Sequence, residues 1–268
     1  MSHRHLTPLL ASTLLATLAA TVHASPIPSG ISVRASVSAD TVNSSQASNA
    51  NQSGTLLFQG LLDGTNSVGV SNVAYNGLPA NPSSLSGNFT DTSFSQVAYS
   101  INLGGTHNQA GNAENPALFN DLFLDFSNTG STAYKAYFRI DLRFAVQANG
   151  SDAYVQHDFS LEDVTHNLSD IYYSREWRDT VNGNVSDTGG NLLQEVLLNP
   201  GDSVSFHGFE SIKGGAYGDN SSNYSGDIYT SLQLVRFDPI GRQLPLPSSL
   251  WLAGLGLGLM LSRGTKRA

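Results

Sequence analysis

The sequence predicts an all-β fold, an antiparallel β-sandwich of the jelly-roll type, flanked by an N-terminal signal peptide and a C-terminal hydrophobic helix. Three observations lead to this prediction. Segments with an apolar residue at every second position recur through the middle of the chain, which is the period of a strand with one buried face. Turn-forming residues separate these segments, and no segment has the sustained apolar period of a helix. Short strands at this spacing are typical of sandwiches.

The chain divides into five predicted parts. We expect a signal peptide over residues 1–24, a low-complexity lead with one strand over 25–54, the sandwich over 55–238, a linker over 239–243 and a sorting or transmembrane segment over 244–268. In the lead, residues 31–37 alternate as a strand does, whereas residues 43–53 are polar and are predicted to form a loop.

Within the sandwich, alternating or apolar segments predict ten strands, at residues 55–62, 68–75, 97–103, 118–126, 134–148, 153–161, 171–177, 192–198, 203–209 and 228–234. Segments rich in Gly, Pro, Asn and Ser predict loops at residues 78–87 and 214–226. Asn182-Gly183 and Gly189-Gly190 bound a predicted turn region.

The clearest local pattern lies in the middle of the chain. Apolar residues occupy every second position from Tyr134 to Ala148 and again from Ala153 to Leu161. The intervening Asn149-Gly150 is a preferred pair for a type I′ turn. We therefore predict a long β-hairpin with one face in the core. The opposite face of its first strand carries Lys135, Tyr137, Arg139, Asp141 and Arg143.

Composition limits the function classes. The chain has no cysteine, so an exported form must depend on its hydrophobic core or on metal ions. Four of the 13 basic residues lie in the terminal segments, at Arg4, Arg263, Lys266 and Arg267. The remaining 9 face 21 Asp and Glu, so the body has a formal charge of −12, against −8 for the whole chain. Such a body disfavours nucleic acid as a partner, because phosphates require a basic surface.

The N-terminal segment has the features of a secretory signal peptide. A weakly basic start, His3-Arg4-His5, precedes the apolar stretch Leu9–Val22, and Val22-His23-Ala24 is a small-residue cleavage site. We therefore expect export across the inner membrane and removal of residues 1–24.

The C-terminal segment combines a proline pair, an apolar run and a basic end. The run from Leu250 to Leu261 contains no acidic residue, and with its flanks it approaches the roughly 17 residues that a spanning helix needs. Trp251 suits a membrane interface, and the basic end favours the cytoplasmic side. The segment therefore predicts a membrane-anchoring helix.

This tail resembles the PEP-CTERM sorting signals of Gram-negative bacteria, in a Pro-Leu-Pro variant, because Leu246 stands where the name-giving motif has Glu. The matching residues are Pro245, Pro247, Ser248, Ser249, Leu250, Trp251, Leu252, Arg263, Lys266 and Arg267. The resemblance implies processing by an exosortase-like membrane enzyme, association with exopolysaccharide and biofilm, and release to the cell surface or medium after processing.

The body carries no catalytic motif that the sequence reveals. A G-x-S-x-G elbow is absent, and the four histidines of the body lack the spacing of metal ligands: His107, His157, His166 and His207. His157 falls on the apolar face of its strand and is predicted to be a core histidine. The sequence therefore predicts no enzyme and no catalytic residue.

A glycan-hydrolysing pair of carboxylates is the alternative, because such pairs lie about 5–10 Å apart in many secreted sandwiches. Glu162 with Asp163 and Glu176 with Asp179 are the candidates. Adjacent strand residues point to opposite faces, so Glu162 and Asp163 do not form such a pair by themselves. The alternative therefore requires a secreted carbohydrate-active enzyme whose acids meet only in the fold.

A bound ion and a ligand surface complete the hypotheses. No cofactor is indicated, although residues 187–191 and 218–220 offer the oxygen ligands that calcium prefers and are also common turn formers. Tyr137, Arg139 and Arg143 share one strand face, and Trp177 adds an aromatic ring of the kind that binds sugars. Pairing of Arg139 and Arg143 with acids across the sheet, with the tyrosines packed, explains the same residues and is the interpretation that we favour for them. Our main hypothesis is an exported, envelope-anchored, non-enzymatic β-sandwich protein with polysaccharide as a partner.

Overall fold

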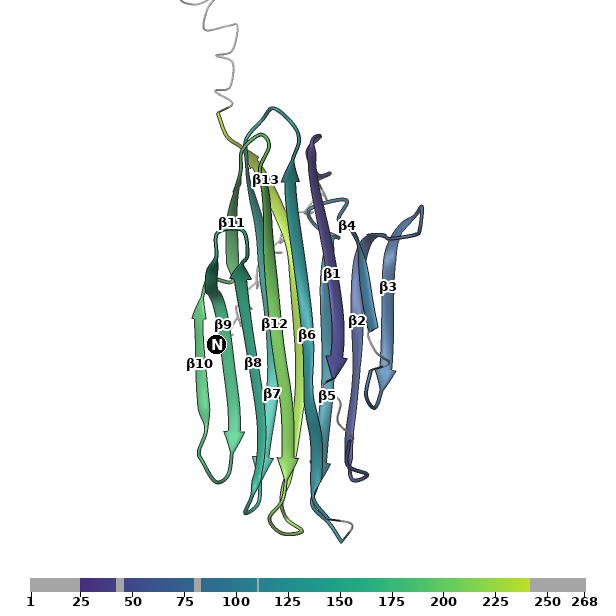
Figure 1. Cartoon of the computed structure of the whole chain (residues 1–268), viewed down its shortest axis with the longest axis vertical. Helices are drawn as coiled ribbons and strands as arrows, with labels where there is room; N and C mark the ends of the chain where they lie inside the picture. Colours follow the sequence, from purple (N-terminus) through teal and green to yellow (C-terminus); the bar gives the residue numbers. More distant parts are fainter. Residues whose placement is uncertain (1–24, 42–45, 80–82, 110, 242–268) are drawn as a thin grey trace, which may run out of the picture.

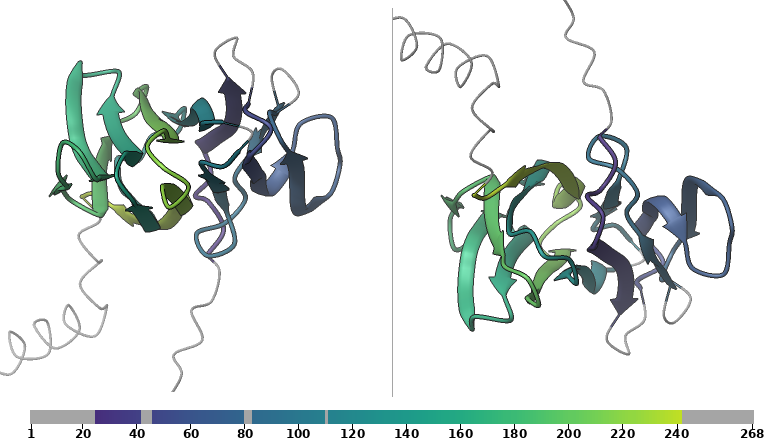
Figure 2. Two further views of the ribbon diagram at one scale, coloured as in Figure 1. Left: turned by 90° about the horizontal axis from the view of Figure 1, so that it is seen from below. Right: turned by 90° about the horizontal axis from the view of Figure 1, so that it is seen from above.

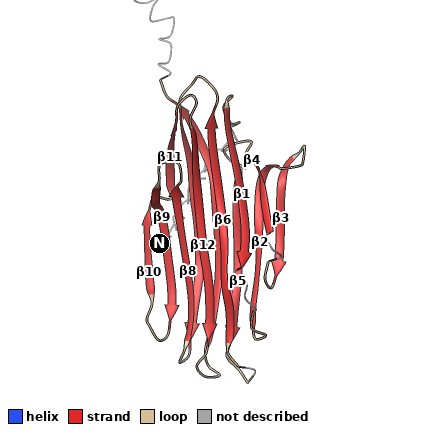
Figure 3. Cartoon of the chain, viewed as in Figure 1, coloured by secondary structure: helices blue, strands red, loops and turns tan. Residues whose placement is uncertain are grey.

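The computed structural model describes residues 25–41, 46–79, 83–109 and 111–241, which contain strands, turns and loops (Figures 1 and 3). The strands are β1 (Ile31–Thr41), β2 (Ala50–Leu62), β3 (Val68–Asn76), β4 (Ser83–Asn88), β5 (Gln96–Thr106), β6 (Ala113–Asn128), β7 (Tyr134–Asn149), β8 (Ala153–Asp163), β9 (Leu168–Asp179), β10 (Val185–Gly190), β11 (Leu193–Leu198), β12 (Ser203–Ala216) and β13 (Asn223–Pro239). The predicted all-β class is confirmed. The predicted signal peptide and the tail from residue 244 onward lie outside the described residues.

The described strands form one antiparallel sheet that curls strongly around a common core (Figure 2). Hydrogen-bonded neighbours follow the order β10-β9-β8-β12-β6-β1-β4-β2-β5-β13-β7-β11, and β3 pairs with β2 beside this path. The curl places β12, β8 and β6 opposite β13, β7 and β5. The chain crosses between these two layers from β5 to β6, from β7 to β8 and from β12 to β13, as a jelly-roll-like sandwich requires.

The predicted hairpin of residues 134–161 is wrong. β7 pairs with β13 and β11, whereas β8 pairs with β12 and β9, so the two strands lie in facing layers. A type I′ turn needs positive φ at both central residues, but here only Gly150 is left-handed, with φ of 96°. A Cβ at Gly150 would collide with the backbone of Ser222. The turn therefore carries the chain from one layer to the other.

Five segments that the sequence assigned to loops or turns belong to strands. Ser83–Asn88 forms β4 and Val185–Gly190 forms β10, β2 begins at Ala50, β12 extends to Ala216, and β13 begins at Asn223. These segments are rich in Ser, Gly and Asn, which have low strand propensity. Pairing with a neighbouring strand outweighs that propensity, and at Gly87 the missing side chain leaves room for the ring of Phe58.

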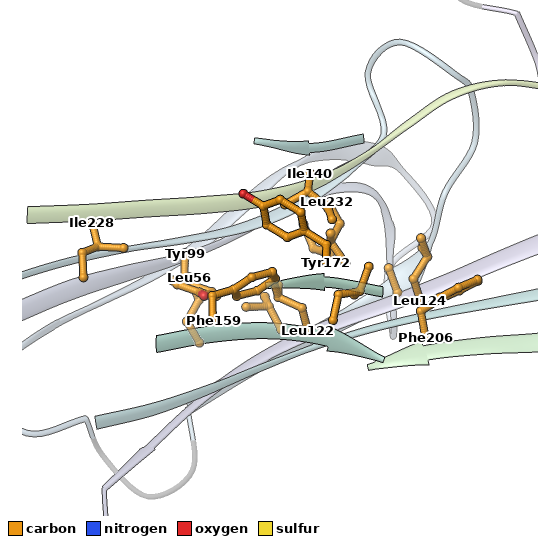
Figure 4. Packing of buried hydrophobic residues seen from close by; sticks show 14 of the residues in the cluster. Leu56, Tyr99, Leu122, Leu124, Ile140, Phe159, Tyr172, Phe206, Ile228 and Leu232 are labelled. Atoms are coloured by element: carbon orange, nitrogen blue, oxygen red, sulfur yellow. The ribbon is translucent and has the colours of Figure 1, made fainter. Parts of the chain in front are cut away.

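The core contains most of the inward side chains of the alternating segments, as predicted, although Phe144 on the predicted core face of β7 is 37% exposed. Figure 4 shows part of this core, in which large apolar side chains from both layers meet: Leu56, Tyr99, Leu122, Leu124, Ile140, Phe159, Tyr172, Phe206, Ile228 and Leu232. Complete burial of such a side chain contributes about 1.5–3 kcal/mol. This burial replaces the disulfides that the chain lacks.

A polar cluster lies inside this apolar core. Glu210 on β12 accepts hydrogen bonds from Asn120 on β6 and Thr230 on β13, each at 3.4 Å. Its Oε1 also lies 2.5 Å from Nε2 of His157 on β8, and both side chains are 0% exposed. Burial raises the pKa of Tyr99, and the nearby Glu210 carboxylate raises it further. The cluster ties strands of both layers to one buried carboxylate, and His157 is the core histidine that the sequence predicted.

Removal of this carboxylate should destabilise the fold strongly. We expect Glu210→Ala to lower the free energy of unfolding by about 3–5 kcal/mol, because the change leaves His157 buried without its partner. Urea denaturation of the full chain measures the loss. Glu162→Ala, on the outer face of β8, is the control and should change stability by no more than about 0.5 kcal/mol. The double variant His157→Leu with Glu210→Leu should lose less than Glu210→Ala; an equal or larger loss would contradict a pairwise role.

Candidate functional site

An open groove lies on the outer face of the layer that contains β12, β8, β9 and β10. Its volume is about 300 Å³, at the lower end of the range for small-molecule sites. Among its lining residues are Asp158, Ser160, Asp170, Tyr173, Arg175, Asp187 and Phe209.

The strand register assembles the groove from two adjacent rows of side chains. One row runs across the strands as Phe209, Ser160, Tyr173 and Gly189. The next row runs as Ser211, Asp158, Arg175 and Asp187. Directly paired residues project to the same face of a sheet, so residues far apart in sequence become neighbours here.

Two aromatic rings form the walls of the groove. Phe209 on β12 and Tyr173 on β9 stand on either side of Ser160, and their strands lie about 10 Å apart, because neighbouring strands are separated by about 4.8 Å. Phe209 is 37% exposed and stacks on Phe119, with the ring centroids 5.6 Å apart. Tyr173 lies over Gly189, where a Cβ would collide with the ring. Both rings are therefore held in place while facing an open space.

The polar side of the groove is organised around Asp158. Arg175 Nε donates a hydrogen bond to Asp158 Oδ1 at 2.8 Å, and the indole nitrogen of Trp177 donates to Oδ2 at 3.1 Å. The Arg175 guanidinium lies 4.9 Å from the centre of the Trp177 ring, a cation–π contact. The hydrogen bond to Asp158 raises the pKa of Arg175. These contacts fix the direction of all three side chains.

Asp170 closes the opposite end of the groove. It has a left-handed backbone with φ of 52°, beside an irregularity in the pairing of β8 with β9. Asp tolerates this conformation better than most residues, yet a non-glycine residue there is uncommon. The Ser160 hydroxyl donates to its carboxylate at 2.6 Å. The groove thus offers exposed acceptors beside two aromatic faces, a combination that suits a hydroxyl-rich ring.

The structure separates the residues of the predicted ligand surface. Trp177 lies on β9 beside the groove, whereas Tyr137, Arg139 and Arg143 lie on β7 in the facing layer. Their contacts there are local. Arg143 bonds Asp141 at 2.7 Å, Arg139 donates to Gln233 at 2.7 Å, and Tyr137 donates to Glu195 at 2.9 Å. Only Trp177 borders the groove.

Neither predicted carboxylate pair meets in the fold. Asp163 is 9% exposed and bonds His166, on the face of β8 opposite to Glu162. Glu176 is buried against Arg178. Burial by itself would raise the pKa of Asp179, but hydrogen bonds from the Asn182 backbone and side chain and from the Val181 backbone lower it, so the net pKa is below its usual value.

The groove brings together a different set of acids, Asp158, Asp170 and Asp187, which sequence reasoning missed. Of the three, only Asp158 lay in a segment predicted to be a strand, and the register that makes them neighbours was not visible in the sequence. Residues 187–190, considered as a calcium loop, belong to β10, and Asp219 accepts from the backbone of Ser221 at 2.9 Å. Within the described ranges, no three acidic or histidine side chains are placed to hold a metal ion. No helix in these ranges is long and apolar enough to cross a membrane.

Comparison with known proteins identifies no family. No family model and no curated protein matches this chain. Among solved structures, one of infectious bursal disease virus Gx strain shares 9% identity at a TM-score of 0.18, over 76% of this chain and 57% of that chain. The T=1 particles derived from infectious bursal virus share 10% identity at a TM-score of 0.13, over 88% and 72%. Scores this low give no evidence about this chain.

The Asp158 contacts predict a spectroscopic change. In a Trp251→Phe background, Asp158→Asn should shift the emission of Trp177 to longer wavelength, because the indole and Arg175 lose the carboxylate that holds them. The free energy of unfolding should fall by no more than about 1 kcal/mol, since the pair is exposed. The matched control is Asp187→Asn, because the Asp187 carboxylate lies 3.5 Å from the Tyr173 hydroxyl. This change should leave the emission of Trp177 unchanged. Equal spectra for the two variants would mean that Asp158 does not position Trp177.

Proposed function

We propose that this protein is an exported, envelope-anchored, non-enzymatic β-sandwich protein that binds polysaccharide of the extracellular matrix through the groove. The observation that carries the proposal is the pair of aromatic walls, Tyr173 and Phe209, beside ordered carboxylates. The apolar faces of a sugar ring pack against aromatic rings, and sugar hydroxyls donate to carboxylates. The C-terminal resemblance to PEP-CTERM signals supports the envelope location, exopolysaccharide as the partner and an exosortase-like enzyme as the processing partner.

The charge of the groove restricts the chemical class of polysaccharide that it can bind. Three carboxylates and a single guanidinium line it, on a body whose formal charge is negative. A neutral saccharide or one with amino groups is compatible with this surface. A polyanionic glycan would be repelled, because only Arg175 could oppose its charge and Asp158 already engages that side chain.

A carbohydrate-active enzyme is the second candidate, and one observation favours it: Asp158, Asp170 and Asp187 line the same groove. Two of these carboxylates already bind partners tightly, Asp158 with Arg175 and Trp177, and Asp170 with Ser160. Both carboxylates therefore have protein partners that a substrate would have to displace, whereas a general acid must be free to reach the oxygen that it protonates. We therefore place binding ahead of hydrolysis.

Binding should depend on the aromatic walls. We expect Tyr173→Ala and Phe209→Ala each to weaken binding of exopolysaccharide isolated from the host about tenfold, or ~1.4 kcal/mol, because each change removes one stacking surface. Titration calorimetry with the full chain in detergent measures the affinity. Tyr229→Ala, a tyrosine on the outer face of β13 beside Arg143, is the matched control and should bind normally. Equal affinities for all three variants would mean that the groove is not the binding site.

The same samples separate binding from catalysis. Analysis of the polysaccharide after incubation should show no shortened product. Release of product that is lost in Asp158→Asn, Asp170→Asn or Asp187→Asn would instead establish the enzyme.

The tail should determine the location. We expect deletion of residues 244–268 to move the protein from the envelope to the medium in fractionated host cells, because the deletion removes the apolar run and the basic end. Replacement of Pro245 and Pro247 by Ala leaves the apolar run intact and should keep the protein in the envelope while changing its processed size. Identical fractionation of the deleted and complete chains would contradict anchoring by the tail.

A further inference from the structure

β3 has a free edge that differs from the other sheet edges. Among the described strands it pairs only with β2, and it stands at the side of the sheet in Figure 1. Its nine residues, Val68–Asn76, include no charged residue and no proline. The edge strands β10 and β11 are shorter, and they carry Asp187 and Glu195. Charges and short length are the usual protection of an edge against pairing, and β3 has neither.

The alternation of hydrogen-bonded pairs between β2 and β3 shows which backbone groups of β3 do not bond to β2. Gly77 donates to the Gln52 carbonyl, so this pair and every second pair along the ladder are hydrogen-bonded. Gly69, Ser71, Val73 and Tyr75 therefore bond to β2. The backbone groups of the intervening residues point away from it: Val68, Val70, Asn72, Ala74 and Asn76.

The same strand of a second copy fits this edge. If β3 pairs with itself antiparallel about Asn72, then Asn72 of one copy faces Asn72 of the other, and Val70 faces Ala74. The backbone groups of all these residues point away from β2. They can therefore bond to the second copy while each β3 keeps its hydrogen bonds to its own β2. Val68 and Val70 are each 52% exposed and would be partly covered. The absence of charge also matters, because two acidic bodies approach here without a charged side chain on either strand.

We propose that two copies of this chain associate through β3 into a symmetric dimer with one continuous sheet. The pairing is isologous and uses both free edges, so it closes at two copies and does not extend into a fibre. Assembly into a fibre, or pairing of β3 with an unrelated extended peptide, would not place Asn72 of one copy opposite Asn72 of another. The cross-linking experiment below distinguishes these cases.

The chain has no cysteine, so a single introduced cysteine reports the register. In the predicted dimer the two Asn72 Cα atoms lie about 5.5 Å apart, within disulfide range. The two Ala74 Cα atoms lie about 14 Å apart, beyond it. With purified full chain and a mild oxidant, Asn72→Cys should therefore become mostly a disulfide-linked dimer while Ala74→Cys stays monomeric. A mixture of Val70→Cys with Ala74→Cys should cross-link.

A proline variant tests the interface without a cross-link. Asn72→Pro removes one outward N–H, so it should sediment as a monomer with a nearly unchanged urea midpoint. Ser71→Pro removes an N–H that bonds to β2 and should lower the midpoint. Weak cross-linking of Asn72→Cys, equal cross-linking of Ala74→Cys, species larger than dimers, or a wild-type chain that sediments as a monomer would each overturn the proposal.

Discussion

The long strands of the described residues have one apolar face, and burial of these faces against each other is the constraint on which the structure depends. The chain has no cysteine, so covalent links cannot substitute for this burial. A flat sheet would leave the apolar face exposed. The sheet instead curls until its two halves face each other around the core that Figure 4 shows. The polar faces are then left outside, where they are free to carry function.

The core also contains a constraint on register. Glu210 finds its partners on β6, β8 and β13. A shift of any of these strands by one residue would turn the partner to the outer face and leave a buried carboxylate unsatisfied, at a cost of several kcal/mol. The cluster thus favours one arrangement of the two layers, whereas apolar contacts alone tolerate several.

The groove and the free edge of β3 lie on different parts of the sheet. β10 ends the hydrogen-bonded path, whereas β3 pairs with β2 beside the path, and the two strands stand at opposite sides of the view in Figure 1. Association through β3 would therefore leave the groove open in both copies. A dimer would present two grooves to one polymer, which raises avidity without any new contact to the ligand. The two proposals are physically compatible but rest on separate residues.

Alternation determined from sequence alone that the body is all-β and which side chains form most of the core, because a period of two residues is a local property. Leu122, Ile140 and Phe159 were placed in the core on this ground, and so was His157. The predicted tail signal likewise depends on contiguous residues, and it stays a prediction because the tail lies outside the described residues. Pairing is different, since Asn149-Gly150 predicted a hairpin and the chain crosses between layers there. Only the tertiary structure decided which strands are neighbours, and with them the groove, because Phe209, Asp158, Tyr173 and Asp187 come from four strands whose register is set by packing of the whole core.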